Sequence, residues 1–234
     1  MDDLNRDSIR DGCQRWCQDS VRYLNILSEV PHHIAEYCKD DIQLDLDERH
    51  RWLLDDIVHT YDHCRRILYR TACFKGKELS EGRNEHVENL LDCYSRLYTI
   101  LDKTAKLVAF LFPWNGERNP NFRAVVEKHS CDSNPFLRAL YYIARDVFSD
   151  KDDVAFDYLD PHIRFLSVVH KPSFVRNNIM HNTIRICTDD SDRMPTFNVE
   201  SITPYELFYY TSKLADDVRE VLMNLQMAVR YRPL

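Results

Sequence analysis

The stretch EHVENLLDCYSRLYTILDKTAKLVAFLF, from Glu85 to Phe112, decides the fold class of this chain. Its apolar residues return every three or four positions, which is the spacing that places side chains on one face of an α-helix. The stripe consists of Val87, Leu90, Leu91, Tyr94, Leu97, Tyr98, Leu101, Ala105 and Val108. Pro113 and Gly116 follow, and both residues are typical helix breakers. The stretch therefore predicts one long amphipathic helix.

The segment before this helix repeats the same spacing. Between Asp47 and Phe74 the predicted apolar stripe is made of Trp52, Leu53, Ile57, Tyr61, Cys64, Leu68 and Ala72. Residues 1–45 are expected to form one or two shorter helices. Near the other end, the run TDDSDRMPTFNVESITP has turn composition and leaves room for a short extended piece.

The second half of the chain carries helix start signals. Residues 113–134 are predicted to be a connection with one short helical turn. Asn134 and Pro135 look like an N-cap and a first helical residue, ahead of a helix over residues 136–148. Pro204 opens a last long helix. With only 4 Gly in 234 residues, the sequence predicts an all-α antiparallel helical bundle with short connections.

Charge and cysteine content limit the classes of function. The net charge of −7 disfavours a protein that coats nucleic acid non-specifically, because such binding depends on neutralising phosphates, but it allows a local basic groove. No apolar run is long enough to span a bilayer and the N-terminus has no apolar core, so a cytoplasmic protein is expected. In a reducing compartment the eight cysteines are expected to be free and to fill the core.

The stretch FVRNNIMHN, from Phe174 to Asn182, stands out within the second half. Residues 161–188 around it contain no Asp or Glu. The same window holds the bases Arg164, Lys171, Arg176 and Arg185 and the histidines His162, His170 and His181. In a chain of net charge −7 this local reversal of sign would attract an anion. The alternative is that acidic residues of neighbouring helices neutralise it.

Helical geometry divides the polar residues of this stretch between two directions. On a helix that continues through the window, Asn177, His181 and Arg185 are spaced four apart and share one face. Arg176 lies about 140° from His181, so the two side chains of one helix converge poorly. Two such helices that cross about a two-fold axis would each contribute an Arg and a His to a shared cleft. The spacing therefore predicts a homodimeric site.

These residue types suit metal-independent cleavage of RNA. Histidine can accept and return a proton near neutral pH, and arginine presents a fork of donors that stabilises charge developing on a phosphate. The 2′-oxygen would attack the adjacent phosphorus with His181 moving protons and Arg176 stabilising the oxyanion, which leaves a 2′,3′-cyclic phosphate. No cluster of carboxylates suggests a two-metal nuclease, and no cofactor is expected.

The run Arg176-Asn177-Asn178-Ile179-Met180-His181, late in an all-helical chain, resembles the R-x(4–6)-H signature of the HEPN superfamily. The stretches YTILDKTAKLVAFLF (98–112) and LRALYYIARDVF (137–148) and the FRAVV loop are similar to one prokaryotic branch of these domains. The resemblance covers roughly residues 85–190. It implies a single all-helical domain over residues 1–234, with a HEPN-like core at about 85–190, an N-terminal elaboration at about 1–80 and an extra C-terminal helix.

The resemblance also implies roles for individual residues. Many HEPN proteins are ribonucleases of toxin, defence or RNA-processing systems, and they dimerise along the motif helix. Carried over, Arg176 and His181 are the catalytic pair and Asn177 supports them. HEPN toxins that a partner nucleotidyltransferase silences carry a tyrosine two residues after the histidine. Thr183 stands there in this chain, which puts regulation by nucleotide attachment in doubt.

Several other residues are weaker candidates. Asp102 and Lys103 are expected either to brace the catalytic pair or to form an ordinary surface ion pair. Together with Lys171 and Arg185, the bases Arg138 and Arg145 on one face of the helix 136–148 are candidates for binding the substrate, or else belong to a solvated face.

Metal binding has little support in the sequence. The pairs Cys13/Cys17 and His59/His63 have i, i+4 spacing that suits a metal, but neither pair has an evident third ligand. No metal site is therefore predicted. The aromatic residues Trp16, Trp52 and Tyr209-Tyr210 are expected in the core or in a dimer interface.

Two hypotheses of function follow. The first is a homodimeric, metal-independent endoribonuclease of HEPN type, a toxin or antiviral defence effector with a possible antitoxin or other defence-system partner protein. The second is a non-catalytic HEPN module that binds RNA, a nucleotide or a partner protein. The intact Arg176 and His181 favour the enzyme, and the overall acidity favours the binding module.

Overall fold

The computed structural model describes residues 46–73, 84–116, 120–148, 184–186, 200–202 and 204–232. These residues form five helices and two strands of three residues each. The elements are α2 (Glu48–Cys73), α4 (Asn84–Leu111), α5 (Phe122–Lys128), α6 (Pro135–Phe148), β1 (Ile184–Ile186), β2 (Glu200–Ile202) and α9 (Pro204–Arg230). The predicted all-α bundle is confirmed, with the small sheet as an addition.

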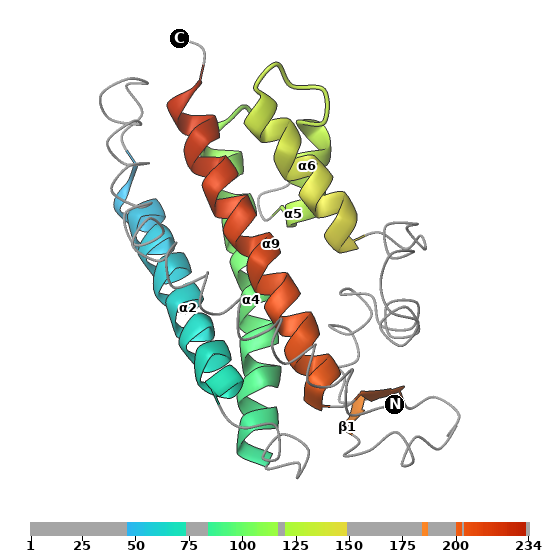
Figure 1. Cartoon of the computed structure of the whole chain (residues 1–234). Helices are drawn as coiled ribbons and strands as arrows, with labels where there is room; N and C mark the ends of the chain where they lie inside the picture. The colour runs from blue at the N-terminus through green and yellow to red at the C-terminus, as the bar shows by residue number, and fades with distance from the viewer. Residues whose placement is uncertain are drawn as a thin grey trace.

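The long helices lie side by side along the molecule (Figure 1). α2 packs antiparallel to α4, and α9 lies against both of them, running in the same direction as α4. α6 packs antiparallel against the second half of α9, and the short α5 fills the space between α4 and α6. The bundle is therefore a row of packed helices in which α4 and α9 occupy the centre.

The helix boundaries agree with the signals in the sequence. Asn134 caps α6, because its side-chain Oδ1 accepts the backbone N–H of Phe136 at 3.0 Å and that of Leu137 at 3.4 Å. In the predicted connection, Asn121 caps α5 in the same way by accepting the N–H of Ala124 at 2.8 Å. The predicted helix end at Pro113 and the predicted helix start at Pro135 agree with the observed boundaries of α4 and α6 to within two residues.

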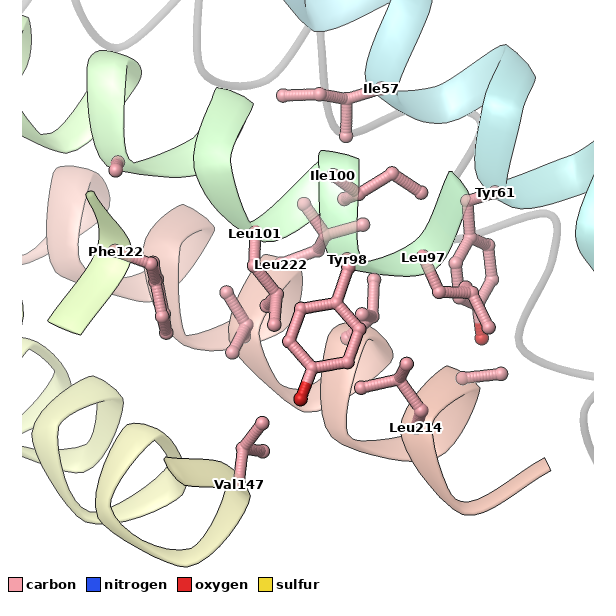
Figure 2. Packing of buried hydrophobic residues seen from close by; sticks show 14 of the residues in the cluster. Ile57, Tyr61, Leu97, Tyr98, Ile100, Leu101, Phe122, Val147, Leu214 and Leu222 are labelled. Carbon is pink, nitrogen blue, oxygen red and sulfur yellow. The ribbon is translucent and has the colours of Figure 1, made fainter. Parts of the chain in front are cut away.

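One core extends through the whole bundle (Figure 2). Ile57 and Tyr61 of α2 meet Leu97 and Ile100 of α4, while Leu101 of α4 points towards α9. α9 contributes Leu214 and Leu222, α5 contributes Phe122 and α6 contributes Val147. Burial of these large apolar side chains holds the helices together, since each contributes roughly 1.5–3 kcal/mol.

The predicted stripe of α2 was wrong at Trp52. This side chain is 68% exposed, and the buried residue in that turn is Leu54. Trp52 precedes Leu54 by two positions, or about 200° of helix rotation, which turns its ring away from the core. Trp52 is therefore no part of the core of this chain, and the other expected place, a dimer interface, stays a prediction.

Two cysteines contact each other's backbone where the middle parts of α2 and α4 pack together. The thiol of Cys64 donates to the carbonyl of Cys93 at 3.6 Å, and the thiol of Cys93 donates to the carbonyl of Cys64 at 3.6 Å. Burial raises the pKa of the Cys93 thiol well above its ordinary value, so the thiol stays protonated. Both residues are free and buried, as expected for core cysteines, whereas Cys131 is free but exposed.

The two short strands join distant parts of the chain. β1 pairs with β2 in parallel, with Arg185 opposite Ser201. β2 lies in the run that was predicted to hold a short extended piece, directly before the start of α9. The sheet therefore sits beside the N-terminal end of α9, at the lower end of the bundle in Figure 1.

Candidate functional site

The predicted catalytic residues Arg176, Asn177 and His181 lie outside the described residues, and so does Lys171. Their roles stay predictions. The nearest described part of the chain is β1, which begins three residues after His181.

Arg185 requires a correction. The predicted polar stripe placed it on the same helix face as Asn177 and His181. The structure places Arg185 in the middle of β1, where its backbone pairs with Ser201. Successive residues of a strand point to opposite faces, so the four-residue spacing of a helix does not apply to Arg185. The β-branched neighbours Ile184 and Ile186 favour a strand here. Pairing with β2 therefore decides the local structure, and the helical spacing does not.

The candidates on α4 have partners elsewhere in the bundle. The ammonium group of Lys103 contacts the carboxylate of Asp56 on α2 and joins the two helices. Asp102, on the same turn, is half-buried. The predicted alternative of an ordinary ion pair therefore describes Lys103, although its partner is Asp56 and not Asp102. A role beside the catalytic pair stays a prediction for both residues.

The two candidate arginines of α6 share one exposed face. Arg138 and Arg145 are both exposed, opposite the buried residues Leu140 and Ala144. The guanidinium group of Arg145 lies over the ring of Tyr142, 5.4 Å from its centre. The face is basic and aromatic, but nothing in the described residues shows it to belong to an RNA-binding cleft.

The histidine pair of α2 lacks the ligands of a metal site. The ring of His59 is 2.7 Å from the carbonyl oxygen of Asp55, within its own helix. Across the residues that the structure describes, no group of three or more His, Cys, Asp or Glu side chains is arranged to hold a metal ion. Cys13 and Cys17 lie outside these residues.

A groove that the sequence did not predict opens where α2 begins and α4 ends. Its volume is about 730 Å³, within the usual range for small-molecule sites of roughly 300–1,000 Å³. α2 lines it with Arg49, His50 and Trp52, and α4 lines it with Lys106 and Phe110. The rings of His50 and Phe110 stack with their centres 3.8 Å apart, which joins the two helices at this end.

Trp114 closes the groove on the side of the connection after α4. The ammonium group of Lys128 lies over its ring at 5.4 Å from the centre, a cation–π contact. Gly116 makes room for the same ring, since a Cβ at this position would come within 2.2 Å of its Cζ2 atom. These contacts fix Trp114 as a half-buried wall of the groove.

The sequence carried a signal for this groove that the helical pattern hid. Trp52 fits a helical stripe by spacing, so it was assigned to the core or a dimer interface. The available signal was Trp114, an aromatic residue directly after the helix breaker Pro113 and outside every predicted stripe. What could not be inferred from spacing is that the start of one helix meets the end of the next, 50 to 60 residues later in the chain.

The comparisons with known proteins agree with the fold. The family model of the LA2681-like HEPN domains matches residues 50–232, which include four of the five described helices in full and α2 from its third residue. The chain belongs to this family and so to the HEPN superfamily. No curated protein and no solved structure matches the chain.

The match is wider than the resemblance seen in the sequence. It begins well before residue 85 and ends well after residue 190, and the segment with Arg176 and His181 lies within it. The division into a core and elaborations stays a prediction. Among the helices of the described residues, none is both long and apolar enough to cross a membrane.

Proposed function

We propose that this protein is a metal-independent endoribonuclease of HEPN type with a composite active site in a homodimer. One observation carries the proposal: a chain that belongs to the HEPN superfamily has kept both Arg176 and His181 at the spacing of the superfamily motif. A toxin or an antiviral defence effector, with an antitoxin or another partner protein, is the setting that the superfamily suggests.

The proposed reaction needs only the substrate and side chains of the motif. His181 takes the proton of the 2′-hydroxyl, and the 2′-oxygen forms a bond to the adjacent phosphorus. The bond from phosphorus to the 5′-oxygen breaks, and the leaving oxygen takes up a proton. Arg176 stabilises the negative charge that develops on the phosphate oxygens, and Asn177 orients the imidazole or the substrate. The products are a 2′,3′-cyclic phosphate and a 5′-hydroxyl.

Local charge supports this proposal. The acid-free window of residues 161–188 is basic in a chain of net charge −7. This window would attract an RNA backbone, whereas the remaining surface, which is acidic, would repel it. The exposed Arg138 and Arg145 of α6 offer a second basic face. Like Lys171 and Arg185 of the acid-free window, they are candidates for binding the substrate.

The test is incubation of the purified protein with mixed RNA in excess EDTA. We expect fragments with cyclic phosphate ends. His181→Ala should lower the rate about a hundred- to ten-thousand-fold, since this is the usual contribution of a general acid or base. Arg176→Ala should lower it about a hundred- to thousand-fold, as loss of an oxyanion donor does.

Matched controls separate the motif from general charge effects. His59→Ala and Arg66→Ala each remove the same residue type from the exposed face of α2 and should cleave at the rate of the parent protein. Equal loss of activity in the control and the motif variants would contradict the assignment. Sedimentation should give about twice the chain mass of 27.9 kDa, and a strict monomer would contradict the composite site.

A second function has support of its own. The groove between α2 and α4 is lined by aromatic and basic side chains, which is the composition of a nucleotide-binding surface. A non-catalytic module that binds RNA, a nucleotide or a partner protein would need such a surface and no cleavage. Intact RNA that nevertheless binds the protein under several activating conditions would favour this function.

A further inference from the structure

Three features of the groove between α2 and α4 argue for a ligand. First, Trp52 is 68% exposed, and folding gains little from an indole left in water. Second, the aromatic ring of Trp52 on α2 and the rings of Phe110 and Trp114, at the end of α4 and just after it, line one cavity. Third, Gly116 permits a close approach that holds the ring of Trp114 in this wall. Packing of the bundle does not account for this combination.

The charges of the groove suit a phosphate next to an aromatic group. Arg49 and Lys106 line it from opposite helices, and Lys128 lies over Trp114. The acid in the lining is Asp56, which is already paired with Lys103. A second acid, Glu48, accepts a long hydrogen bond of 3.4 Å from the indole of Trp52 at the rim. Within the lining itself the bases Arg49 and Lys106 outnumber the acid Asp56, and the further acid Asp47 is paired with His50 at 2.6 Å.

We infer that this groove binds single-stranded RNA, with bases against Trp52 and Trp114 and phosphates beside Arg49 and Lys106. Every base has a flat face that can stack on an indole, and cations along the groove follow the backbone, so this arrangement binds single strands with little sequence preference. The choice of RNA as the ligand rests on the proposed ribonuclease function.

Binding is measured with the full chain carrying His181→Ala, so that the RNA stays uncut. The probe is a fluorescein-labelled adenosine RNA of roughly twelve nucleotides, followed by anisotropy. Adding Trp52→Ala should weaken binding roughly five- to hundred-fold, the usual cost of losing one stacked base, and Trp52→Phe should restore most of it. Tyr231→Ala removes a comparably exposed aromatic ring, 56% exposed, directly after α9 and outside the lining of the groove, and should change nothing.

The cations are tested through salt. Lys106→Ala should lower the slope of log affinity against log salt concentration by about one, because one phosphate contact is lost. Arg66→Ala makes the same charge change on the exposed surface of α2, away from the groove, and should leave the slope unchanged.

Three results would overturn the inference. Unchanged RNA affinity in both Trp52→Ala and Lys106→Ala would show that RNA binds elsewhere. Displacement of the probe by adenosine monophosphate at equal concentration would assign the groove to a free nucleotide. Loss of the dimer in Trp52→Ala with unchanged RNA affinity would make it an interface between two copies. None of these depends on cleavage, so failure of the ribonuclease proposal and failure of this one are distinguishable.

Discussion

α2 and α4 contact each other along their middle parts and again at one end of the bundle. The first contact is tightly packed, and the second leaves a groove. In their middle parts Ile57, Cys64, Leu97 and Ile100 are fully buried, and the two cysteine thiols reach each other's carbonyl groups. At the open end the same two helices separate into a groove of about 730 Å³ with Trp52 exposed at its edge. The same pair of helices therefore gives a packed contact at one level and a cavity at the next.

Stability and the inferred ligand binding belong to different levels of this bundle. Apolar burial in the middle part holds α2, α4 and α9 together, and a cavity there would cost stability. At the open end the indole of Trp52 is 68% exposed, so it contributes little to the core and is accessible to a ligand. Substitutions at the two places should therefore have opposite effects on stability and on binding.

The largest effect is expected from Leu97→Ala in the packed middle part. Leu97 is 0% exposed and contacts the cores of α2 and α9, so its truncation leaves a cavity and should lower the free energy of unfolding by about 3 kcal/mol. Trp52→Ala removes a larger side chain at the open end but should change the stability by less than about 0.5 kcal/mol. Urea unfolding followed by circular dichroism measures both. A costly Trp52→Ala would mean that the groove is a structural part of the fold.

The second effect concerns the contact between α6 and α9. Asn134 caps the start of α6 and also donates from Nδ2 to the carbonyl of Ala228 at 2.9 Å. This carbonyl belongs to the last turn of α9, where no helical N–H is left to satisfy it. One side chain therefore completes the ends of two helices.

Asn134→Ala removes both functions and should lower the free energy of unfolding by about 2 kcal/mol, from the lost cap and the unsatisfied buried carbonyl. Asn134→Ser is the matched control, because serine keeps the cap acceptor and loses the donor to Ala228. It should cost about half as much, measured by the same urea titration. Equal costs for the two variants would show that the donor to Ala228 alone matters, and a neutral Asn134→Ser would show that the cap alone matters.

Asn134 also shows which of its contacts can be predicted from the sequence and which cannot. Asn followed by Pro before an apolar run predicts a helix start from local chemistry, and α6 begins there. The donor to Ala228 could not be predicted, since its partner lies 94 residues away and depends on how α6 meets α9. The predicted burial of Trp52 was wrong for a related reason. A period of three or four residues fits Trp52 to the apolar stripe, but the rotation of α2 turns its side chain towards solvent.

The candidate site divides in the same way. The spacing of Arg176 and His181 is a weak signal by itself, and the motif was recognisable because other segments of the chain resemble the same family. The family match includes the segment of the motif. The extension of the motif helix to Arg185 was wrong, because pairing of β1 with β2 is decided by residues that lie far away in the sequence. The groove was missed because its lining comes from several segments that only the packed bundle brings together.

A smaller effect is expected where the two cysteines meet. Cys93→Ser places a hydroxyl group in a fully buried contact and should lower the free energy of unfolding by about 1 kcal/mol. Cys131→Ser makes the same change at an exposed position and should be neutral within about 0.5 kcal/mol. Thermal unfolding under reducing conditions measures both. A neutral Cys93→Ser would mean that water reaches the middle part, which would weaken its contrast with the open end.

The smallest effect is expected at the turn between α5 and α6, which takes no part in the contacts between α2 and α4. Partial burial acts to raise the pKa of Asp132, but hydrogen bonds from the backbone N–H of Asn134 and from the ring of His129, 3.1 Å away, outweigh it and hold this pKa below the ordinary 3.8. A lowered folded-state pKa stabilises the protein above the unfolded value. That contribution is lost as the pH falls below 3.8 through the folded-state pKa.

Asp132→Asn should therefore cost a few tenths of a kcal/mol at pH 7, the usual size for a partly exposed ion pair. The variant should also lose less stability than the parent between about pH 5 and pH 2, because it has no carboxylate to protonate. Urea midpoints across this pH range measure the difference. Parallel pH profiles for the two proteins would contradict the lowered pKa, whereas Asn134→Ser, which keeps the backbone donor to Asp132, should follow the parent profile.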